Sequence, residues 1–349
     1  MGMSSQWLKP SRRTTLWLSF SARYLVNVED LNNVESAGNY VRHRRAPLVY
    51  MDNGTYVVSY VPAVSGEMIA HGYQENLVLV AKQLNLPVDA LAEQGYFIKR
   101  GGDDKLHEGT KCGNIKDPLG YEKCVIEEDI VEDVAGFLNP NKVVKRVSNI
   151  AFSYMIPALD AVKKATLTPQ FHVRYAPQAQ RGQQSIYNIE VSSASYIVTG
   201  YLDLGGVGCT QNQEYQCISS KLDRVNAALG ALALTLTQFM FGAKKTRVNP
   251  VTEIEAVMVA LSEKPFNTPP LTLSNGKLDE SVKLALGTAA SLKSVLNMSR
   301  SVSIHLYSKP GLITSINDVK YVDNPVKVFD NTKREINEIM GEGSEGTGN

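Results

Sequence analysis

The sequence predicts an α+β fold in which helices cover one face of an antiparallel sheet, and three observations support it. Residues 16–28 alternate between apolar and polar side chains, which is the two-residue period of a strand. Residues 66–84 and 221–241 carry apolar side chains at helical spacing. With the insertions set aside, the strongest elements follow the order strand, helix, strand, strand, helix, strand. This βαββαβ order is that of the ferredoxin-like or RRM-like topology.

Turn and capping signals place the remaining elements. Asp52-Asn53-Gly54 predicts the turn of a short hairpin, because Asn-Gly favours the tight turns that join two strands. Ser65 is the expected N-cap of the helix over 66–84, and Pro87 lies beyond the end of that helix. The other strands are expected at 169–175, 185–204, 253–261 and 301–307, with a further helix at 278–297.

We expect one domain over residues 1–349 with large insertions in its sheet. Glycines and prolines between residues 95 and 124 predict a long flexible insertion. The expected segments are an insertion at 29–64, a flexible and helical insertion at 95–140, a thumb-like projection at 174–187 and a disordered tail at 341–349.

Charge is segregated along a chain whose formal net charge is only +1. Residues 140–189 contain seven Lys or Arg and one acidic residue, whereas residues 99–133 contain six cations and ten acids. The 43% hydrophobic content excludes global disorder, and the net charge excludes a uniformly basic protein. Basic segments within a neutral chain suit a polyanion-binding surface, and solubilising surface charge remains the alternative.

The sequence predicts no membrane partner. The N-terminal residues lack the apolar stretch of a signal peptide, so we expect a soluble, cytoplasmic protein. The most apolar stretch, 225–243, contains Asn226, Gly230 and Gln238 and is better interpreted as a buried helix than as a membrane span.

The four cysteines do not have the spacing of a metal site. Cys112, Cys124, Cys209 and Cys217 include no CxxC pair, so we expect neither metal nor cofactor. Buried or loop thiols are the favoured interpretation. A loop disulfide between Cys209 and Cys217 remains the alternative, although such bonds are rare in the cytosol.

One face of the first predicted strand suits single-stranded RNA. It carries an aromatic ring, two hydroxyls, a guanidinium and an amide, namely Trp17, Ser19, Ser21, Arg23 and Asn27. His172 and Arg174 are expected to share this sheet face. Such groups provide base stacking, phosphate pairing and base-edge hydrogen bonds on an RRM-type sheet. The alternative is that an inserted domain covers this face and satisfies these residues internally.

Three basic motifs add candidate phosphate contacts. They are Arg42-His43-Arg44-Arg45, Lys145-Arg146-Val147-Ser148 and Gly242-Ala243-Lys244-Lys245-Thr246-Arg247. The last motif lacks the GxxxxGK[ST] spacing of a phosphate loop and follows a helix, so nucleotide hydrolysis is not expected. For each motif, a solvated basic surface is the alternative.

His172 is the candidate general base for RNA cleavage. No carboxylate or second histidine stands at an informative spacing from it, so we favour an RNA-facing or structural histidine and expect no catalytic residue.

The segment Ser21–Pro47 (SARYLVNVEDLNNVESAGNYVRHRRAP) resembles the backbone subunit of the CRISPR surveillance complex Cascade. That family is Cas family seven, in its archaeal type I-A, DevR-like branch of the RAMP superfamily. Shorter matches are VSGEMI at 64–69, DVAGFL at 133–138, KRVS at 145–148 and FGAKKTR at 241–247. Together the motifs extend over most of the chain.

The resemblance implies an RRM-like palm with an inserted helical element and a thumb. It implies copies of the chain stacked head to tail along a CRISPR RNA, whose bases pair with target DNA, together with other Cascade subunits. Residues 176–184 would be the tip of the thumb and 95–124 an outer insertion. Backbone subunits of this family are generally not nucleases.

The predicted RNA contacts combine the strand face, the basic motifs and the family motifs. They are Ser21, Arg23, Asn27, Asn39, Arg42, His43, Arg44, Arg45, Ser65, Gly66, Lys145, Arg146, Ser148, His172, Arg174, Lys244, Lys245 and Arg247. Two alternative functions remain. One is a metal-independent RAMP-type endoribonuclease that uses His172, and the other is a DNA-binding regulator, against which the absence of a helix-turn-helix pattern argues.

Overall fold

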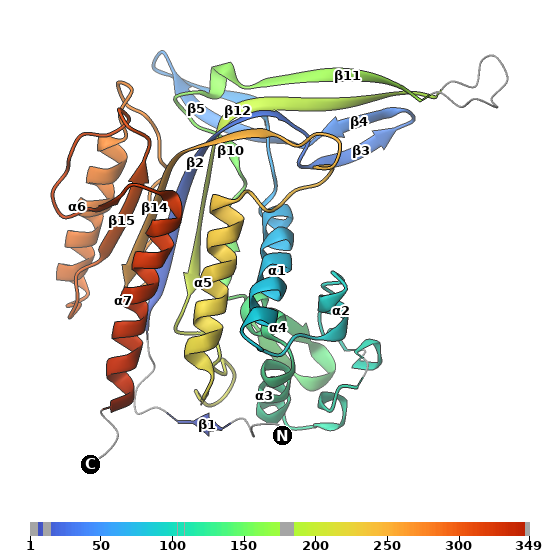
Figure 1. Cartoon of the computed structure of the whole chain (residues 1–349), viewed down its shortest axis with the longest axis vertical. Helices are drawn as coiled ribbons and strands as arrows, with labels where there is room; N and C mark the ends of the chain where they lie inside the picture. Colours follow the sequence, from blue (N-terminus) through green and yellow to red (C-terminus); the bar gives the residue numbers. More distant parts are fainter. Residues whose placement is uncertain (1–5, 10–14, 103, 108, 175–184, 346–349) are drawn as a thin grey trace.

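The computed structural model describes residues 6–9, 15–102, 104–107, 109–174 and 185–345. Its main sheet has the strand order β16-β15-β14-β2-β12-β4-β3, and β9, β10 and β11 also pair with β12. Helices α1, α5 and α7 lie against one face of this sheet and α6 against the other (Figure 1). The centre of the sheet is therefore buried on both sides.

The centre of the main sheet is antiparallel. β2 (Trp17–Glu29) pairs on one side with β12 (Ser185–Asp203) and on the other with β14 (Val251–Ser262). The other strands of this sheet are β3 (Asn33–Ala37), β4 (Tyr40–His43), β9 (Ile150–Phe152), β10 (Ile156–Pro157), β11 (Thr166–Arg174), β15 (Ser303–Ser308) and β16 (Lys320–Val322). The strands predicted from the sequence are confirmed, with small shifts at their ends.

The helices α1 (Gly66–Gln83), α5 (Lys221–Thr237) and α6 (Asp279–Val295) are confirmed near their predicted positions. Ser65 caps α1 as expected, because its Oγ accepts a hydrogen bond from the Met68 amide at 3.2 Å. The other helices are α2 (Ala90–Glu93), α3 (Pro118–Glu128), α4 (Ile130–Ala135) and α7 (Pro325–Glu345), with 3-10 turns η1 (Asp104–Leu106), η2 (Cys112–Asn114), η3 (Pro140–Lys142) and η4 (Val162–Lys164).

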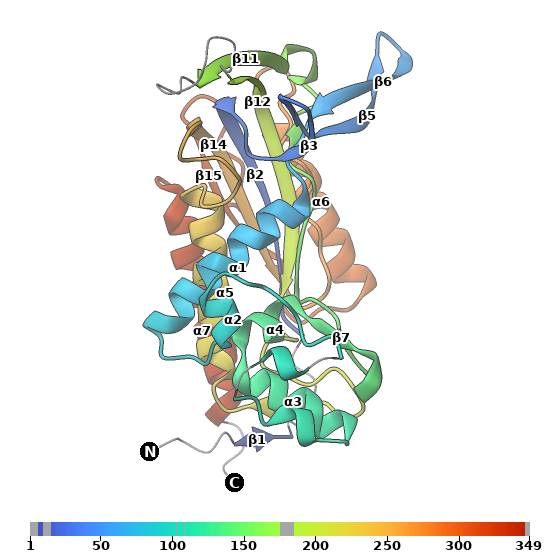
Figure 2. The ribbon, with the colours of Figure 1, turned by 90° about the vertical axis from the view of Figure 1, so that its right-hand side faces the viewer.

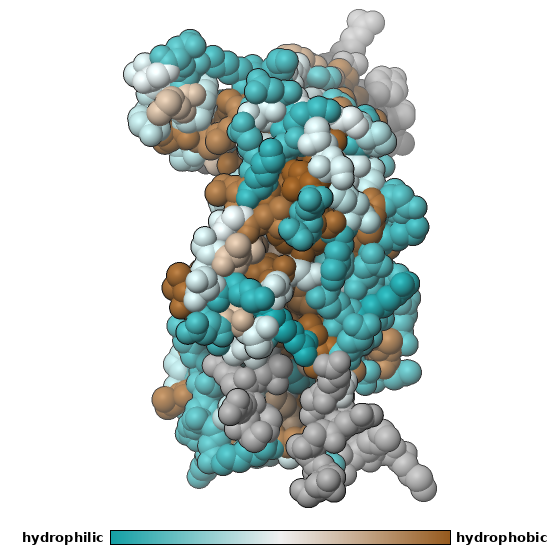
Figure 3. All heavy atoms as spheres, turned by 90° about the vertical axis from the view of Figure 1, so that its left-hand side faces the viewer, coloured by the Kyte–Doolittle hydropathy of each residue, from teal (hydrophilic) through white to brown (hydrophobic). Residues whose placement is uncertain are grey.

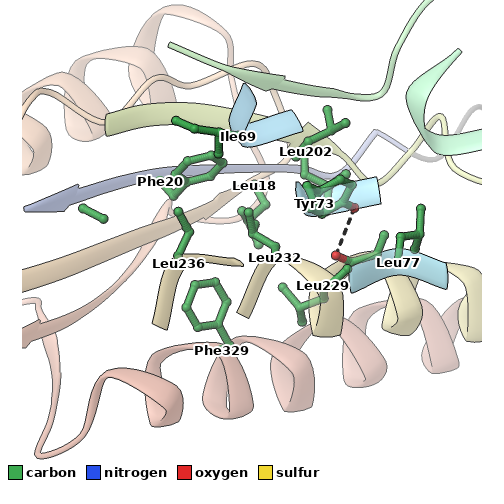
Figure 4. Close-up of a cluster of buried hydrophobic side chains, with 14 of the residues drawn as sticks. Leu18, Phe20, Ile69, Tyr73, Leu77, Leu202, Leu229, Leu232, Leu236 and Phe329 are labelled. Atoms are coloured by element: carbon green, nitrogen blue, oxygen red, sulfur yellow. Dashed lines mark hydrogen bonds between the residues drawn. The ribbon is translucent and has the colours of Figure 1, made fainter. Parts of the chain in front are cut away.

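The main core lies between β2 and the helices α1, α5 and α7. Figure 4 shows Phe20 of β2 facing Leu236 of α5, with Phe329 of α7 beside them. The Tyr73 hydroxyl of α1 donates a hydrogen bond to the Ala228 carbonyl of α5 at 3.1 Å. Burying each large apolar side chain contributes roughly 1.5–3 kcal/mol, so this contact layer fixes the helices on the sheet.

The lower end of the molecule in Figure 1 has a separate small core. It lies between α3 and the hairpin of β7 (Phe137–Asn139) and β8 (Val144–Arg146). Disulfides join Cys112 to Cys124 and Cys209 to Cys217. The expectation of free thiols is therefore wrong. The alternative Cys209–Cys217 bond is confirmed, whereas Cys112 meets Cys124 only because η2 folds back against α3.

The upper end carries a projecting hairpin of β5 (Arg45–Asp52) and β6 (Thr55–Pro62), with the predicted turn between them (Figure 2). At the opposite end, β1 (Trp7–Leu8) pairs with β13 (Cys217–Ile218). No helix in the described part of the chain has the length and apolar character needed to cross a membrane.

The sequence analysis missed α7. This helix buries Val328, Phe329 and Ile336 in the main core and continues to Glu345. Residues 341–345 were expected to be disordered, whereas α7 continues through them, beyond Ile339 and Met340, the last described side chains that pack against the core. Residues 346–349 lie outside the described residues.

Candidate nucleic-acid interface

The turn at residues 29–32, directly after β2, joins three of the predicted motifs. The Asn32 carbonyl accepts a hydrogen bond from the Arg44 amide at 2.7 Å, and its Oδ1 accepts one from the Ser65 amide at 2.8 Å. The Leu31 carbonyl accepts one from the Ala243 amide at 2.8 Å. Residues 29–32, 42–45, 65–66 and 242–247 are called the junction below.

A buried ion pair holds β4 to this turn. His43 is 1% exposed, and its Nε2 lies 2.7 Å from Glu29 Oε1. Burial alone would lower the pKa of His43, but the Glu29 carboxylate outweighs it and the pKa is raised. His43 is therefore a structural residue of the junction, and its predicted RNA contact is wrong.

Two lysines hold the segment after α5 against the same turn. Lys244 Nζ lies 3.6 Å from the buried Asp30, and Lys245 Nζ donates to the Phe239 carbonyl at 2.7 Å. Burial raises the pKa of Asp30, and the charge of Lys244 opposes this shift. These contacts hold residues 242–247 against the turn. Both lysines remain partly exposed, so they also reach the surface of the junction.

Three arginines at the junction have no carboxylate within ion-pair distance in the part of the chain that the structure describes. Arg42 and Arg247 are exposed, and Arg44 is half-buried. The Arg42 guanidinium lies 5.8 Å from the centre of the Tyr40 ring. Arg45 differs, because it pairs with Glu190 at 2.7 Å. Arginines without carboxylate partners, in a chain that is nearly neutral overall, are the groups that a polyanion neutralises.

Backbone strain gathers in the junction and in the residues next to it. Val28, Phe239 and Lys244 have φ values of 53°, 53° and 51°, which are unfavourable for residues other than glycine. Gly242 has φ 99°, and a Cβ there would stand 2.5 Å from Leu31 Cδ2. Gly66 starts α1 so close to the Phe152 carbonyl oxygen that a Cβ would overlap it. Strained positions of this kind cluster at functional sites.

The strand face predicted to be open to RNA is covered. Ser21 is fully buried, and its Oγ accepts a hydrogen bond from the Leu271 amide at 3.2 Å. Arg23 is 2% exposed and pairs with Asp160 and Glu255, each at 2.8 Å. Both predicted RNA contacts are wrong, because residues far along the chain pack over this part of the face. The alternative of internal satisfaction therefore holds for Ser21 and Arg23, whereas Asn27 on the same face is exposed.

The motif Lys145-Arg146-Val147-Ser148 lies away from the junction, at the lower end. Arg146 is buried and pairs with Asp133 and, at 3.0 Å, with Glu122, so its predicted RNA contact is wrong. Ser148 Oγ donates to the Ile150 carbonyl at 2.7 Å. Lys145 is exposed and stays available to a ligand.

The remaining predicted contacts lie on strands of the upper end. Asn27 is exposed at the end of β2, and the carbonyl of the exposed Asn39 accepts a hydrogen bond from the Asn188 amide. His172 is exposed on β11, and its ring stacks on Tyr187 with centroids 5.1 Å apart. Arg174 ends β11, but its side chain and the tip at 176–184 lie outside the described residues.

Sequence reasoning missed an apolar surface on the β5–β6 hairpin. One face of the hairpin is exposed and carries Pro47, Val49, Met51, Tyr56, Val58 and Tyr60. The two-residue alternation of these side chains is visible in the sequence, but only the structure shows that nothing described packs over it. The space-filling view shows this hairpin projecting from the body at the upper end (Figure 3).

A hollow between α6 and β15 lies on another side of the molecule from the junction. Apolar side chains line it, including Leu286, Ala289, Val302 and Ile304, with Lys293 and Lys320 at its edge. None of the predicted RNA contacts belongs to this hollow.

The comparisons with known proteins agree with the motifs. A family model described as "CRISPR-associated negative auto-regulator DevR/Csa2" matches residues 20–282. The chain is 62% identical over 293 residues to "CRISPR-associated protein Cas7/Csa2 1" of Saccharolobus solfataricus, covering 82% of this chain and 91% of that protein. It is 38% identical over 294 residues to "CRISPR-associated aCascade subunit Cas7/Csa2 2" of the same organism, covering 80% and 88%.

The fold also has a solved counterpart. A chain of a "CRISPR RNA-guided surveillance complex, pre-nicking" aligns with a TM-score of 0.54 and 10% sequence identity, over 91% of this chain and 99% of that one. At this identity the likeness concerns the mixed α/β fold alone.

Proposed function

Because the chain belongs to the CRISPR-associated DevR/Csa2 family, we propose that it is a backbone subunit of a Cascade-type complex that binds CRISPR RNA. The observation that carries this proposal is the junction. There Arg42, Arg44 and Arg247 lack carboxylate partners in the described part of the chain and stand beside strained backbone. Cations held in this way suit an RNA backbone, which they contact without reading its sequence.

We infer that β14, β2, β12 and the strands beyond β12 form a ferredoxin-like palm. Their chain order is β2, α1, β9 to β11, β12, α5, β14, and their spatial order is β14-β2-β12 followed by β9, β10 and β11. Both orders match the βαββαβ topology. On this proposal residues 174–187 form the thumb, and 29–64 and 95–140 are insertions.

We propose that copies stack head to tail along the guide RNA, which then pairs with target DNA. The exposed apolar face of the β5–β6 hairpin supports assembly, because monomeric proteins rarely expose a continuous apolar surface of this kind. Head-to-tail stacking requires a different surface on each side of the subunit and does not close into a two-fold dimer.

We propose that the chain itself is not a nuclease. His172 stacks on Tyr187, and no carboxylate lies within ion-pair distance of its ring among the described residues. A general base for RNA cleavage needs a partner that orients it and an acid that protonates the leaving group. The exposed position of His172 suits stacking against a nucleobase instead.

The test is to purify the full chain and sequence the nucleic acid that co-purifies with it. We expect RNA that carries CRISPR repeat sequence. In the second part, defined RNAs of increasing length are added and the particle mass is measured by light scattering, and we expect the mass to rise with RNA length. A protein that retains no RNA and binds none would overturn the proposed function. A two-fold dimer indifferent to RNA would overturn the stacking alone.

The thumb assignment has its own test. Residues 176–184 are replaced by a short Gly-Ser turn, and the cooperativity of loading on long RNA is compared with that of the unmodified chain. We expect a folded protein with reduced cooperativity. Unchanged cooperativity would show that these residues do not form the thumb.

A further inference from the structure

We propose that Cys112, Cys124 and Glu128 bind Zn²⁺ when the disulfide between the two cysteines is reduced. The two sulfur atoms and a carboxylate oxygen of Glu128 all lie within 4.8 Å of one another. Cys112 Sγ lies 3.3 Å from Glu128 Oε2. Thiolate and carboxylate are established Zn²⁺ ligands, and three protein ligands leave a fourth position for water.

Local structure already positions the three groups. Cys124 and Glu128 are four residues apart on α3 and therefore share one face of the helix. Glu128 Oε2 accepts hydrogen bonds from Thr110 Oγ1 at 2.6 Å and from Arg100 Nη2 at 2.9 Å. Such outer contacts orient a ligating carboxylate. Arg100 also pairs with Asp89 and Glu132, so it keeps partners if a metal takes Glu128.

The small core at the lower end is stabilised by the Cys112–Cys124 disulfide. A metal bound by the same two cysteines would replace that link when the disulfide is reduced. Among the described residues, the hydrophobic core of the lower end consists of Cys112, Tyr121, Cys124, Val125, Phe137 and Val144, and it is separate from the two larger cores. Small apolar cores contribute little stability by themselves, so a disulfide or a metal adds to what the buried ion pairs of Arg146 already provide. Under reducing conditions the disulfide is lost, and Zn²⁺ then restores the link.

The chemistry balances with a thiol or phosphine as the reductant. Two electrons and two protons convert the sulfur–sulfur bond into two thiols. A thiol reductant supplies both and becomes its own disulfide, whereas a phosphine supplies the electrons and becomes a phosphine oxide, with one water molecule giving its oxygen to the phosphorus and its two protons to the sulfurs. Zn²⁺ then displaces the two thiol protons and binds both thiolates and the Glu128 carboxylate. The site therefore exists in only one redox state of the chain.

The second disulfide supplies a matched control. Lys221 Nζ lies 2.8 Å from Cys209 Sγ, so a cation stands where Glu128 stands in the first pair. In the described part of the chain, Cys209 and Cys217 belong to no group with a third ligand. The Lys221 ammonium contacts the sulfur atom that would bind the metal, whereas at the first pair Arg100 contacts only the carboxylate of Glu128, so Cys209 and Cys217 should remain without metal after reduction.

The experiment uses the full chain, reduced with a phosphine and desalted without oxygen. Zn²⁺ is titrated in competition with a chromophoric chelator, and Cd²⁺ is added separately to detect thiolate-to-metal charge transfer in the ultraviolet. We expect about one Zn²⁺ per reduced chain and none per oxidised chain. Cys112→Ser and Cys124→Ser should abolish this binding, Glu128→Gln should weaken it at least about tenfold, and the Cys209→Ser/Cys217→Ser variant should keep it.

A second measurement avoids the risk that a variant fails to fold. The unmodified reduced chain is alkylated with and without Zn²⁺, and each cysteine is followed by mass spectrometry. Protection of Cys112 and Cys124 but not of Cys209 and Cys217 supports the site. Equal alkylation of all four cysteines, or Zn²⁺ binding that survives in Cys112→Ser, would mean adventitious metal only and would overturn the proposal.

Discussion

Arg23 and Asp160 form a two-pronged ion pair, in which Nη1 and Nη2 each donate to one carboxylate oxygen at 2.8 Å. Arg23 Nε donates to Glu255 on the neighbouring strand at 2.8 Å. The guanidinium of β2 thus fixes the segment after β10 against the sheet. Arg23, which the sequence predicted to bind RNA, is therefore a structural residue.

Removing Arg23 should destabilise the fold. Arg23→Ala removes a buried guanidinium and leaves the partly exposed carboxylates of Asp160 and Glu255 without their cation, so we expect a loss of roughly 2–3 kcal/mol in the free energy of unfolding. Chemical denaturation with two independent probes measures it. Lys327→Ala on α7, which removes one partner of an exposed ion pair, is the control and should leave stability nearly unchanged. A fully stable Arg23→Ala protein with impaired RNA binding would return this residue to the interface.

The junction arginines should set RNA affinity without setting sequence preference. The variant Arg42→Ala/Arg44→Ala/Arg247→Ala should weaken binding equally for all RNA sequences and reduce the salt dependence by roughly one unit of slope per lost contact. Affinity is measured against salt concentration by fluorescence anisotropy.

The matched control removes three exposed lysines elsewhere, in the variant Lys116→Ala/Lys283→Ala/Lys333→Ala. This control loses the same formal charge as the junction variant. Comparing the two therefore separates the effect of local RNA contacts from the effect of the protein's total charge on RNA affinity. An equal loss of affinity in both variants would contradict a role specific to the junction.

His172 should have no catalytic role. Pure protein incubated with repeat-containing RNA should leave it intact, with or without divalent metal, because the described residues offer this ring no carboxylate partner. Product analysis on denaturing gels measures this, and His172→Ala is run in parallel. RNA cleavage that disappears in the variant would establish the endoribonuclease alternative.

Glu335 should make stability sensitive to acid. Burial alone would raise the pKa of Glu335, but hydrogen bonds from His305, Lys320 and Ser303 lower it to about 2. A lowered carboxyl pKa in the folded state gives stability that is complete above the unfolded value near 4.5 and is lost as pH falls towards 2.

The size of this effect is measured against Glu335→Gln. Between pH 7 and pH 3 the unmodified chain should lose roughly 1–2 kcal/mol more unfolding free energy than the variant, because Glu335 is only about half buried and solvent screens part of the effect. Urea denaturation at several pH values gives the difference. Parallel pH profiles for the two proteins would refute it.

The sequence by itself determined the central strands, the helices α1, α5 and α6, and the family. The alternation over 16–28, the cap at Ser65 and the Asn-Gly turn are local signals, and the structure has β2, α1 and the β5–β6 hairpin where those signals predict them. Local periodicity in the sequence predicts which side chains share a face, because the backbone geometry of a strand or helix fixes how many residues separate side chains on the same face. The motifs of the Ser21–Pro47 segment likewise indicated the family before any fold was known.

Only the tertiary structure decided which charged residues face solvent. Arg23 and Arg42 lie in the same family motif, yet Arg23 is buried beneath a segment far along the chain and Arg42 is exposed. Arg146 and His43 are buried in the same way, each paired with a carboxylate from another element of the fold. Burial of a charge depends on whether a partner arrives from elsewhere in the fold to offset its desolvation, and no local pattern records that partner.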